Sequence, residues 1–209
     1  MAPLIVANWK MNPATLKEAV TLFSAVKEAG AVICPPFVYL SALKANGAQD
    51  CFWENPPAGG GAYTGEVSPQ MLKNLGVEYV LIGHSERRKY QGETNEVAEK
   101  KLKAALAAGL KPILCIDKIS QLPKDIKEGF IVAYEPLFAI GTGKPCSFEM
   151  ADEMIVAIKN KVKVTVLYGG SVNSQNAADY IKKAHCDGLL VGGASLKPAE
   201  FIDIVKNAC

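Results

Sequence analysis

YVLIGHSERRKYQGETNEVAEKKLKAALAAGLKPILCI, residues 79–116, contains a complete strand–helix–strand unit. It begins and ends with short apolar runs, 79–82 and 112–116, that are rich in β-branched residues, as buried strands are. Between these runs, apolar residues such as Val97 and Leu106 recur at helical spacing among charged residues. This order indicates two parallel strands joined by a helical crossover.

The same alternation extends over the whole chain. Eight apolar runs are candidate strands, at residues 4–9, 31–34, 49–53, 79–82, 112–116, 131–134, 164–168 and 188–191. Eight such units favour an α/β fold of the closed (β/α)8-barrel type over an open doubly wound sheet, which more often has about five or six strands. No linker divides residues 1–209, so the sequence predicts a single domain with short helices and loops.

Composition and charge exclude several classes of function. The net charge of +2, with both signs interspersed, is too small to favour a nucleic-acid partner. The six cysteines form no CxxC pair and no zinc-like cluster, which predicts reduced thiols and no metal. No signal peptide precedes the first run, and no apolar run approaches the ~20 residues of a membrane helix. We therefore expect a cytoplasmic protein without a membrane partner.

Polar and glycine-rich residues follow the runs, where a parallel barrel carries its chemistry. Glycines at 141–143, 169–170 and 192–193 allow backbone N–H groups to approach an anion closely. Any one of these segments alone is more simply a tight turn. Two consecutive loops of this kind, after the seventh and eighth runs, favour a phosphate site.

Three ionisable residues at the run ends are candidates for acid–base chemistry. Glu135 is a possible base if apolar neighbours raise its pKa, and equally a structural ion-pair partner. His84 alone is more often a structural residue, and Lys10 alone a surface charge. No nucleotide fingerprint or cofactor motif competes with this interpretation. From the residues we infer a barrel that acts on a phosphorylated small molecule by acid–base chemistry.

Six motifs along the chain closely resemble those of the triosephosphate isomerase family. They are ANWKMN (7–12), TGEVSP (64–69), IGHSERR (82–88), AYEPLFAIGTGK (133–144), YGGSV (168–172) and LLVGGASL (189–196). They occur in the family's order and cover the whole chain. The resemblance implies a TIM barrel and a cofactor-free isomerase of glycolysis and gluconeogenesis that interconverts dihydroxyacetone phosphate and D-glyceraldehyde 3-phosphate.

The resemblance also implies roles for individual residues. Glu135 would move a carbon-bound proton, and His84, as a neutral imidazole, would move protons between the enediolate oxygens. Lys10 and Asn8 would stabilise the developing negative charge. The remaining implied positions are the phosphate-binding backbone at Gly141, Ser171, Gly192 and Gly193, the residues Ile140 and Leu190 over the base, the lid latch at Tyr168, and the supporting residues Ser85 and Glu86.

The chain departs from the family pattern outside these positions. It is roughly 40 residues shorter than usual, although still within the range that barrels allow. The family's Gln-Asn pair in the third loop is Gln49-Asp50 here, and the lid's usual tryptophan is Phe138. Lys118 and Pro145 also depart, and with Phe138 they predict a lid biased towards closure.

The family's third loop implies a homodimer, because the segment that inserts into a neighbouring subunit corresponds to the loop around residues 63–66. Two alternatives to the isomerase remain open. One is an aldolase-like phosphosugar barrel, which would require a Schiff-base lysine at the sixth strand in place of Glu135. The other is a barrel that has lost activity, against which every matched catalytic position is filled.

Overall fold

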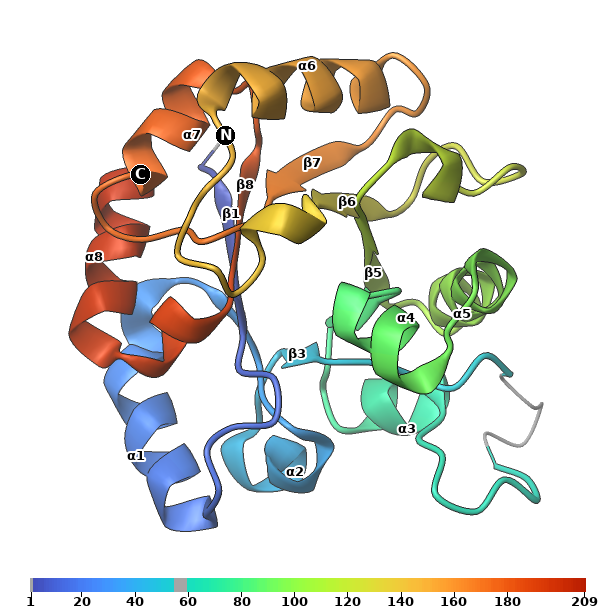
Figure 1. Cartoon of the computed structure of the whole chain (residues 1–209). Coiled ribbons are helices and arrows are strands. Elements are labelled where there is room, and N and C mark those ends of the chain that lie inside the picture. The colour runs from blue at the N-terminus through green and yellow to red at the C-terminus, as the bar shows by residue number, and fades with distance from the viewer. Residues whose placement is uncertain (1, 55–59) are drawn as a thin grey trace.

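Eight parallel strands form one nearly closed barrel in a computed structural model, which describes residues 2–54 and 60–209. Their order is β2-β1-β8-β7-β6-β5-β4-β3, with the helices arranged around them (Figure 1). The strands are β1 (Leu4–Asn8), β2 (Val32–Cys34), β3 (Gly47–Ala48), β4 (Tyr79–Ile82), β5 (Lys111–Ile116), β6 (Ile131–Tyr134), β7 (Thr165–Tyr168) and β8 (Gly188–Val191). The (β/α)8 architecture expected from the sequence is confirmed.

The helices cover the outside of the barrel. They are α1 (Leu16–Val26), α2 (Leu40–Leu43), α3 (Pro69–Asn74), α4 (Ser85–Gln91), α5 (Asn95–Ala107), α6 (Phe148–Lys159), α7 (Ala177–Lys183) and α8 (Pro198–Ala208). Local signals set where they begin: at α1 the Thr15 hydroxyl accepts the Glu18 N–H while the Glu18 carboxylate accepts the Thr15 N–H. None of them, within the described ranges, is long and apolar enough to cross a membrane.

The connection from β5 to β6 is unusual for this architecture. Residues 117–130 contain a single 3₁₀ turn, η3 (Ile119–Gln121), in place of an α-helix. The family resemblance places part of the chain's shortfall at this connection, residues 117–129, and part after β6, residues 147–163. A cavity of about 550 Å³ opens beside it, lined in part by Asp117, Lys118 and Gln121.

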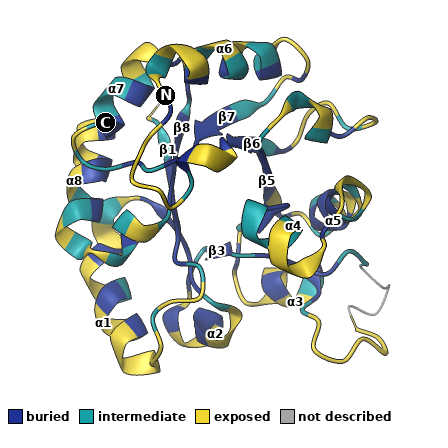
Figure 2. Cartoon of the chain, in the orientation of Figure 1, coloured by how far each residue is buried: buried dark blue, intermediate teal, exposed yellow. Residues whose placement is uncertain are grey.

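The apolar side chains divide into two layers, and the exposed positions lie on the outer faces of the helices and in the loops (Figure 2). The smaller layer fills the barrel interior with residues such as Val6, Leu81 and Leu167. The larger layer lies between strands and helices and includes Leu102, Ile155 and Phe201. Strands buried on both faces explain why the sequence runs are almost continuously apolar.

Strand β3 differs from the expectation. The sequence predicts it at residues 49–53, whereas it comprises Gly47–Ala48. Cys51 and Phe52 are buried, but in a loop, and the Phe52 N–H donates to the Val67 carbonyl at 2.9 Å. Apolar content therefore reflects burial here and not strand conformation, since a short apolar run alone does not separate the two.

The barrel closes between β2 and β3 through side chains. The Ile33 N–H donates to Asn46 Oδ1 at 3.0 Å, and Gln49 Nε2 donates to the Cys34 carbonyl at 3.0 Å. Gly47 permits this approach, because a Cβ atom there would lie 2.5 Å from Cys34 Sγ. Because β3 ends at Ala48, Gln49 lies at the mouth of the barrel, beyond the end of the strand.

Candidate active site

One cavity of about 310 Å³ collects the candidate residues at the carboxyl ends of the strands. Its size suits a small ligand. The candidates that line it are Asn8, Lys10, His84, Glu135, Ile140, Gly141, Ser171, Leu190, Gly192 and Gly193. Ser85 and Glu86 line the adjacent 550 Å³ cavity, to which Glu135 and Ile140 also contribute. Tyr168 is fully buried and lines neither cavity.

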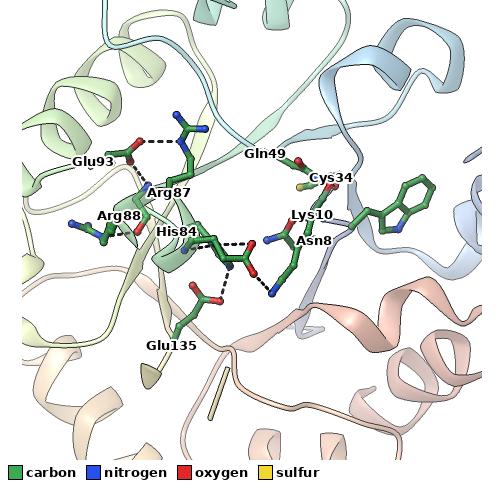
Figure 3. A network of polar contacts seen from close by, with 12 residues as sticks. Asn8, Lys10, Cys34, Gln49, His84, Arg87, Arg88, Glu93 and Glu135 are labelled. Atoms are coloured by element: carbon green, nitrogen blue, oxygen red, sulfur yellow. Dashed lines mark hydrogen bonds and ion pairs between the residues drawn. The ribbon is translucent and has the colours of Figure 1, made fainter. Parts of the chain in front are cut away.

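Glu135 and His84 face each other inside the site (Figure 3). Glu135 Oε1 lies 3.4 Å from His84 Nε2, and the two residues are 6% and 5% exposed. Glu135 Oε2 is buried and has no hydrogen-bond partner among the described residues. At Gly169 a Cβ atom would lie 3.0 Å from Glu135 Cγ, so a glycine there leaves room for the carboxylate. The arrangement provides a carboxylate and an imidazole within reach of one small molecule.

Two influences act on His84 in opposite directions. Burial lowers the pKa of His84, but the neighbouring Glu135 and Glu86 carboxylates outweigh it and hold that pKa above its usual 6.5. The hydrogen bond at Nδ1 opposes protonation there, because the Glu86 backbone N–H donates to His84 Nδ1 at 3.3 Å. A protonated Nδ1 would face that N–H, so this geometry requires a neutral ring with its proton on Nε2, towards Glu135.

Lys10 reaches the cavity from a strained backbone. Its φ of 54° is rare for a residue other than glycine, and such strain is concentrated at functional sites. Two contacts hold it: the Lys10 N–H donates to Asn8 Oδ1 at 3.0 Å, and Gln49 Nε2 donates to the Lys10 carbonyl at 2.6 Å. Lys10 Nζ lies 2.6 Å from Glu86 Oε1. Gln49 was missed as a supporting residue because the sequence placed it within a strand.

Backbone segments at Ser171, Gly192 and Gly193 also line the cavity. Ser171 has a φ of 49°, the second strained non-glycine residue in the site. At Gly192 a Cβ atom would lie 3.4 Å from Lys10 Cε, so the glycine keeps the space beside the cation free. Together with Gly193 these residues form a surface suited to an anion close to the Lys10 charge.

The lid, residues 136–146, includes the 3₁₀ turn η4 (Leu137–Ala139). The Tyr168 hydroxyl accepts the Cys146 N–H at 3.1 Å, so this latch is present. For the closed lid, the family resemblance implies that the Ser171 hydroxyl accepts the Gly143 N–H. The Ser171 hydroxyl instead donates to the Ala139 carbonyl at 2.7 Å, which ties it to η4 and not to the lid tip.

The fold and the site together define a (β/α)8-barrel in which a paired carboxylate and imidazole face a small cavity suited to an anion. The described residues contain no group of three or more His, Cys, Asp or Glu side chains placed to hold a metal ion. The family model described as triosephosphate isomerase matches residues 3–208. The chain belongs to the triosephosphate isomerase family.

Relatives named triosephosphate isomerase match over nearly their full length. Those of Alkaliphilus oremlandii (strain OhILAs) and Dictyoglomus thermophilum (strain ATCC 35947 / DSM 3960 / H-6-12) are each 40% identical to this chain, and that of Thermoanaerobacter sp. (strain X514) is 41% identical. In each case the alignment covers 98% of both proteins. The alignments extend over 249 or 250 positions, so this 209-residue chain lacks segments that the relatives possess.

Proposed function

We propose that Glu135 and His84 carry out the interconversion of dihydroxyacetone phosphate and D-glyceraldehyde 3-phosphate in this member of the triosephosphate isomerase family. Glu135 removes a proton from the carbon next to the carbonyl, and the electron pair forms an enediolate. His84 donates its Nε2 proton to one enediolate oxygen and recovers a proton from the other. Glu135 then returns its proton to the neighbouring carbon. The main support is the buried Glu135–His84 pair, 3.4 Å apart, in a cavity with glycine-bearing loops.

The other residues of the cavity supply charge and exclude water. Lys10 and Asn8 stabilise the developing oxyanion, and the backbone at Gly141, Ser171, Gly192 and Gly193 binds the phosphate. Ile140 and Leu190 line the cavity beside Glu135. Closure of these two side chains over the carboxylate removes its water and strengthens it as a base.

The decisive experiment replaces Glu135 by Gln in the otherwise intact chain. The amide cannot accept the carbon-bound proton, so kcat should fall by about 10²–10⁴-fold or more while the fold persists. The exposed Glu153→Gln on α6 is the matched control and should retain parental turnover. Turnover is measured by coupling the conversion of glyceraldehyde 3-phosphate to dihydroxyacetone phosphate. A Glu135→Gln enzyme with near-parental kcat would remove Glu135 from the mechanism.

We also infer a homodimer. Met11, Val38 and Tyr90 are 92%, 78% and 69% exposed, which is costly for large apolar side chains. Met11 and Tyr90 line one groove, which also reaches Lys10 and His84. The exposed loop that contains Tyr63, with Pro56 and Pro57 outside the described residues, is the segment that would enter this groove of a second subunit. The five buried free cysteines support a reducing compartment, in keeping with the cytoplasm.

Light scattering tests the assembly. The parent chain should scatter as a dimer at micromolar concentration. Met11→Glu should scatter as a monomer with reduced activity, because a carboxylate in the groove opposes burial. Met150→Glu, at a 51% exposed position on α6, is the control and should remain dimeric. An active parental monomer at this concentration is incompatible with the proposal.

A further inference from the structure

The backbone immediately before His84 has unusual freedom. Gly83 joins β4 to His84 and has a φ of 70°, in the left-handed region that glycine adopts readily. A Cβ atom there would lie 2.7 Å from Arg88 Nη2, so a larger residue would displace the Arg88 side chain. Glycine also samples more conformations than any other residue. The direction of His84 therefore depends on contacts that fix the Gly83 backbone.

Charged side chains hold both polar groups of Gly83. The Gly83 N–H donates to Glu93 Oε1 at 2.9 Å, and Arg88 Nε donates to the Gly83 carbonyl at 2.6 Å. Hydrogen bonds to ionised groups are shorter and stronger than neutral ones. The Gly83 carbonyl belongs to the peptide bond whose nitrogen is that of His84. Arg88 consequently fixes the peptide plane from which the imidazole projects, and Figure 3 shows it beside His84, on the side away from Lys10 in that view.

The Arg88 side chain is held in place by a hydrogen bond to Asn95, but one of its donors is left buried without a partner. Its Nη1 donates to Asn95 Oδ1 at 2.7 Å. Its Nη2 is buried and has no hydrogen-bond partner among the described residues. A buried donor without a partner is unfavourable and uncommon in native structures, so its retention calls for a specific role. The planar fork explains why arginine is used, since one lysine ammonium lacks the geometry to reach both Gly83 and Asn95 in this way.

We propose that Arg88 is a positioning residue for the isomerase reaction, holding the Gly83–His84 peptide so that His84 Nε2 stays directed at the enediolate oxygens. The inference rests on the proposed role of His84. A purely structural role, tying α4 to the start of α5 through Asn95, is the alternative. The two differ in whether loss of Arg88 changes the imidazole and kcat or only the stability of the fold.

The experiment uses Arg88→Met, which keeps an apolar stem but removes the donor to Gly83. A displacement of about 1 Å at a catalytic group costs on the order of 10²-fold, so kcat should fall about 10–100-fold with KM changed less than kcat. Arg88→Lys, which keeps a charged donor, should recover part of this loss. Lys89→Met removes the same charge from the same helix and should keep parental kcat.

A second readout reports on the imidazole directly. The chain has two histidines, and His185 is exposed with a φ of 44°, which asparagine tolerates. In a His185→Asn background the ¹⁵N and Cε1–H signals therefore come from His84 alone. Arg88→Met should shift or broaden these signals, with folding checked by circular dichroism. If Arg88→Met does not fold, Arg88→Lys is judged by the same two readouts.

Unchanged His84 signals, or a kcat within about twofold of the parent once corrected for the folded fraction, would overturn the proposal. His84→Gln separates this failure from failure of the mechanism. If His84→Gln turns over normally, the role of His84 in the reaction is wrong, whereas the His84 signals still report whether Arg88 fixes the ring.

Discussion

Replacing Asp50 by Asn should change how the stability of this fold depends on pH. Asp50 is 6% exposed, and Lys101 Nζ lies 2.8 and 2.7 Å from its two oxygens. Arg87 Nε lies 2.7 Å from Asp50 Oδ2. Burial raises the pKa of Asp50 from 3.8 to about 6; Lys101 and Arg87 oppose this shift, and the nearby Glu93 carboxylate adds to it.

The direction in which Asp50 changes the stability of the fold with pH follows from proton binding. A raised pKa means that the folded chain holds the Asp50 proton more tightly than the unfolded chain does. Between about pH 4 and pH 6 this group therefore makes the fold less stable as pH rises. Above that range the full loss in the free energy of unfolding persists. A shift from 3.8 to about 6 corresponds to about 3 kcal/mol, at roughly 1.4 kcal/mol per pKa unit.

Asparagine has no proton to lose at this position. The free energy of unfolding of Asp50→Asn, relative to the parent, should therefore rise by up to about 3 kcal/mol between about pH 4 and pH 8. Glu93 does not obscure this window. Burial raises its pKa, but Lys101 and Arg87 outweigh burial and hold that pKa below its usual 4.5, so its stabilising contribution is complete above about pH 4.5 and is lost only as pH falls below that value.

Guanidinium-induced unfolding, followed by the fluorescence of Trp9 and Trp53 at one protein concentration, measures this difference across the pH range. The control is Asp179→Asn, which removes a carboxylate that is 40% exposed and paired with Lys183 on the same helix. Its effect should vary little with pH, since exposed pairs contribute about 0–1 kcal/mol. An Asp50→Asn difference that is the same at both ends of the range, or that falls as pH rises, would refute the reasoning.

Two further predictions concern the lid and the barrel closure. The family resemblance implies that a lid tryptophan donates its indole N–H to a glutamate when the lid is open. Phe138 and Lys118, both exposed, stand in place of that donor and acceptor, so the hydrogen bond cannot form in this chain. Phe138→Trp alone should change binding and turnover little. Phe138→Trp combined with Lys118→Glu should stabilise the open lid, and therefore weaken binding of a phosphate-bearing transition-state analogue up to roughly tenfold and speed turnover. One hydrogen bond of about 0.5–1.5 kcal/mol accounts for a change of this size. Unchanged binding and turnover in the double variant would exclude a lid biased towards closure. Gly47→Ala should destabilise the fold by about 1–3 kcal/mol in the same unfolding assay, because its Cβ would lie 2.5 Å from Cys34 Sγ. Gly60→Ala, where none of the described residues would lie within 4 Å of the added Cβ, is the control, and equal stability of the two variants would contradict the close approach of β2 and β3 at Gly47.

Local patterns along the chain were sufficient to predict most of the architecture. Strands buried on both faces leave continuous apolar runs, and helices leave a periodic face, so seven of the eight strands coincide with predicted runs to within a residue at either end. The eighth strand, β3, was misplaced because a strand of two residues, Gly47 and Ala48, is too short to produce an apolar run in the sequence. The adjacent apolar residues Cys51 and Phe52 are buried for a different reason, under a loop.

The residues of the candidate site were likewise predictable, because a parallel barrel brings every strand's carboxyl end to one mouth. Chain order alone therefore placed Asn8, His84 and Glu135 around a single cavity. The supporting contacts were not predictable, since they join residues far apart in sequence through side-chain geometry. Gln49 reaches the Lys10 carbonyl across 39 positions, and Asp50 reaches Lys101 across 51. Periodicity and motif spacing carry information about neighbours along the chain, whereas the partner of a buried polar group is set only when the strands and helices pack.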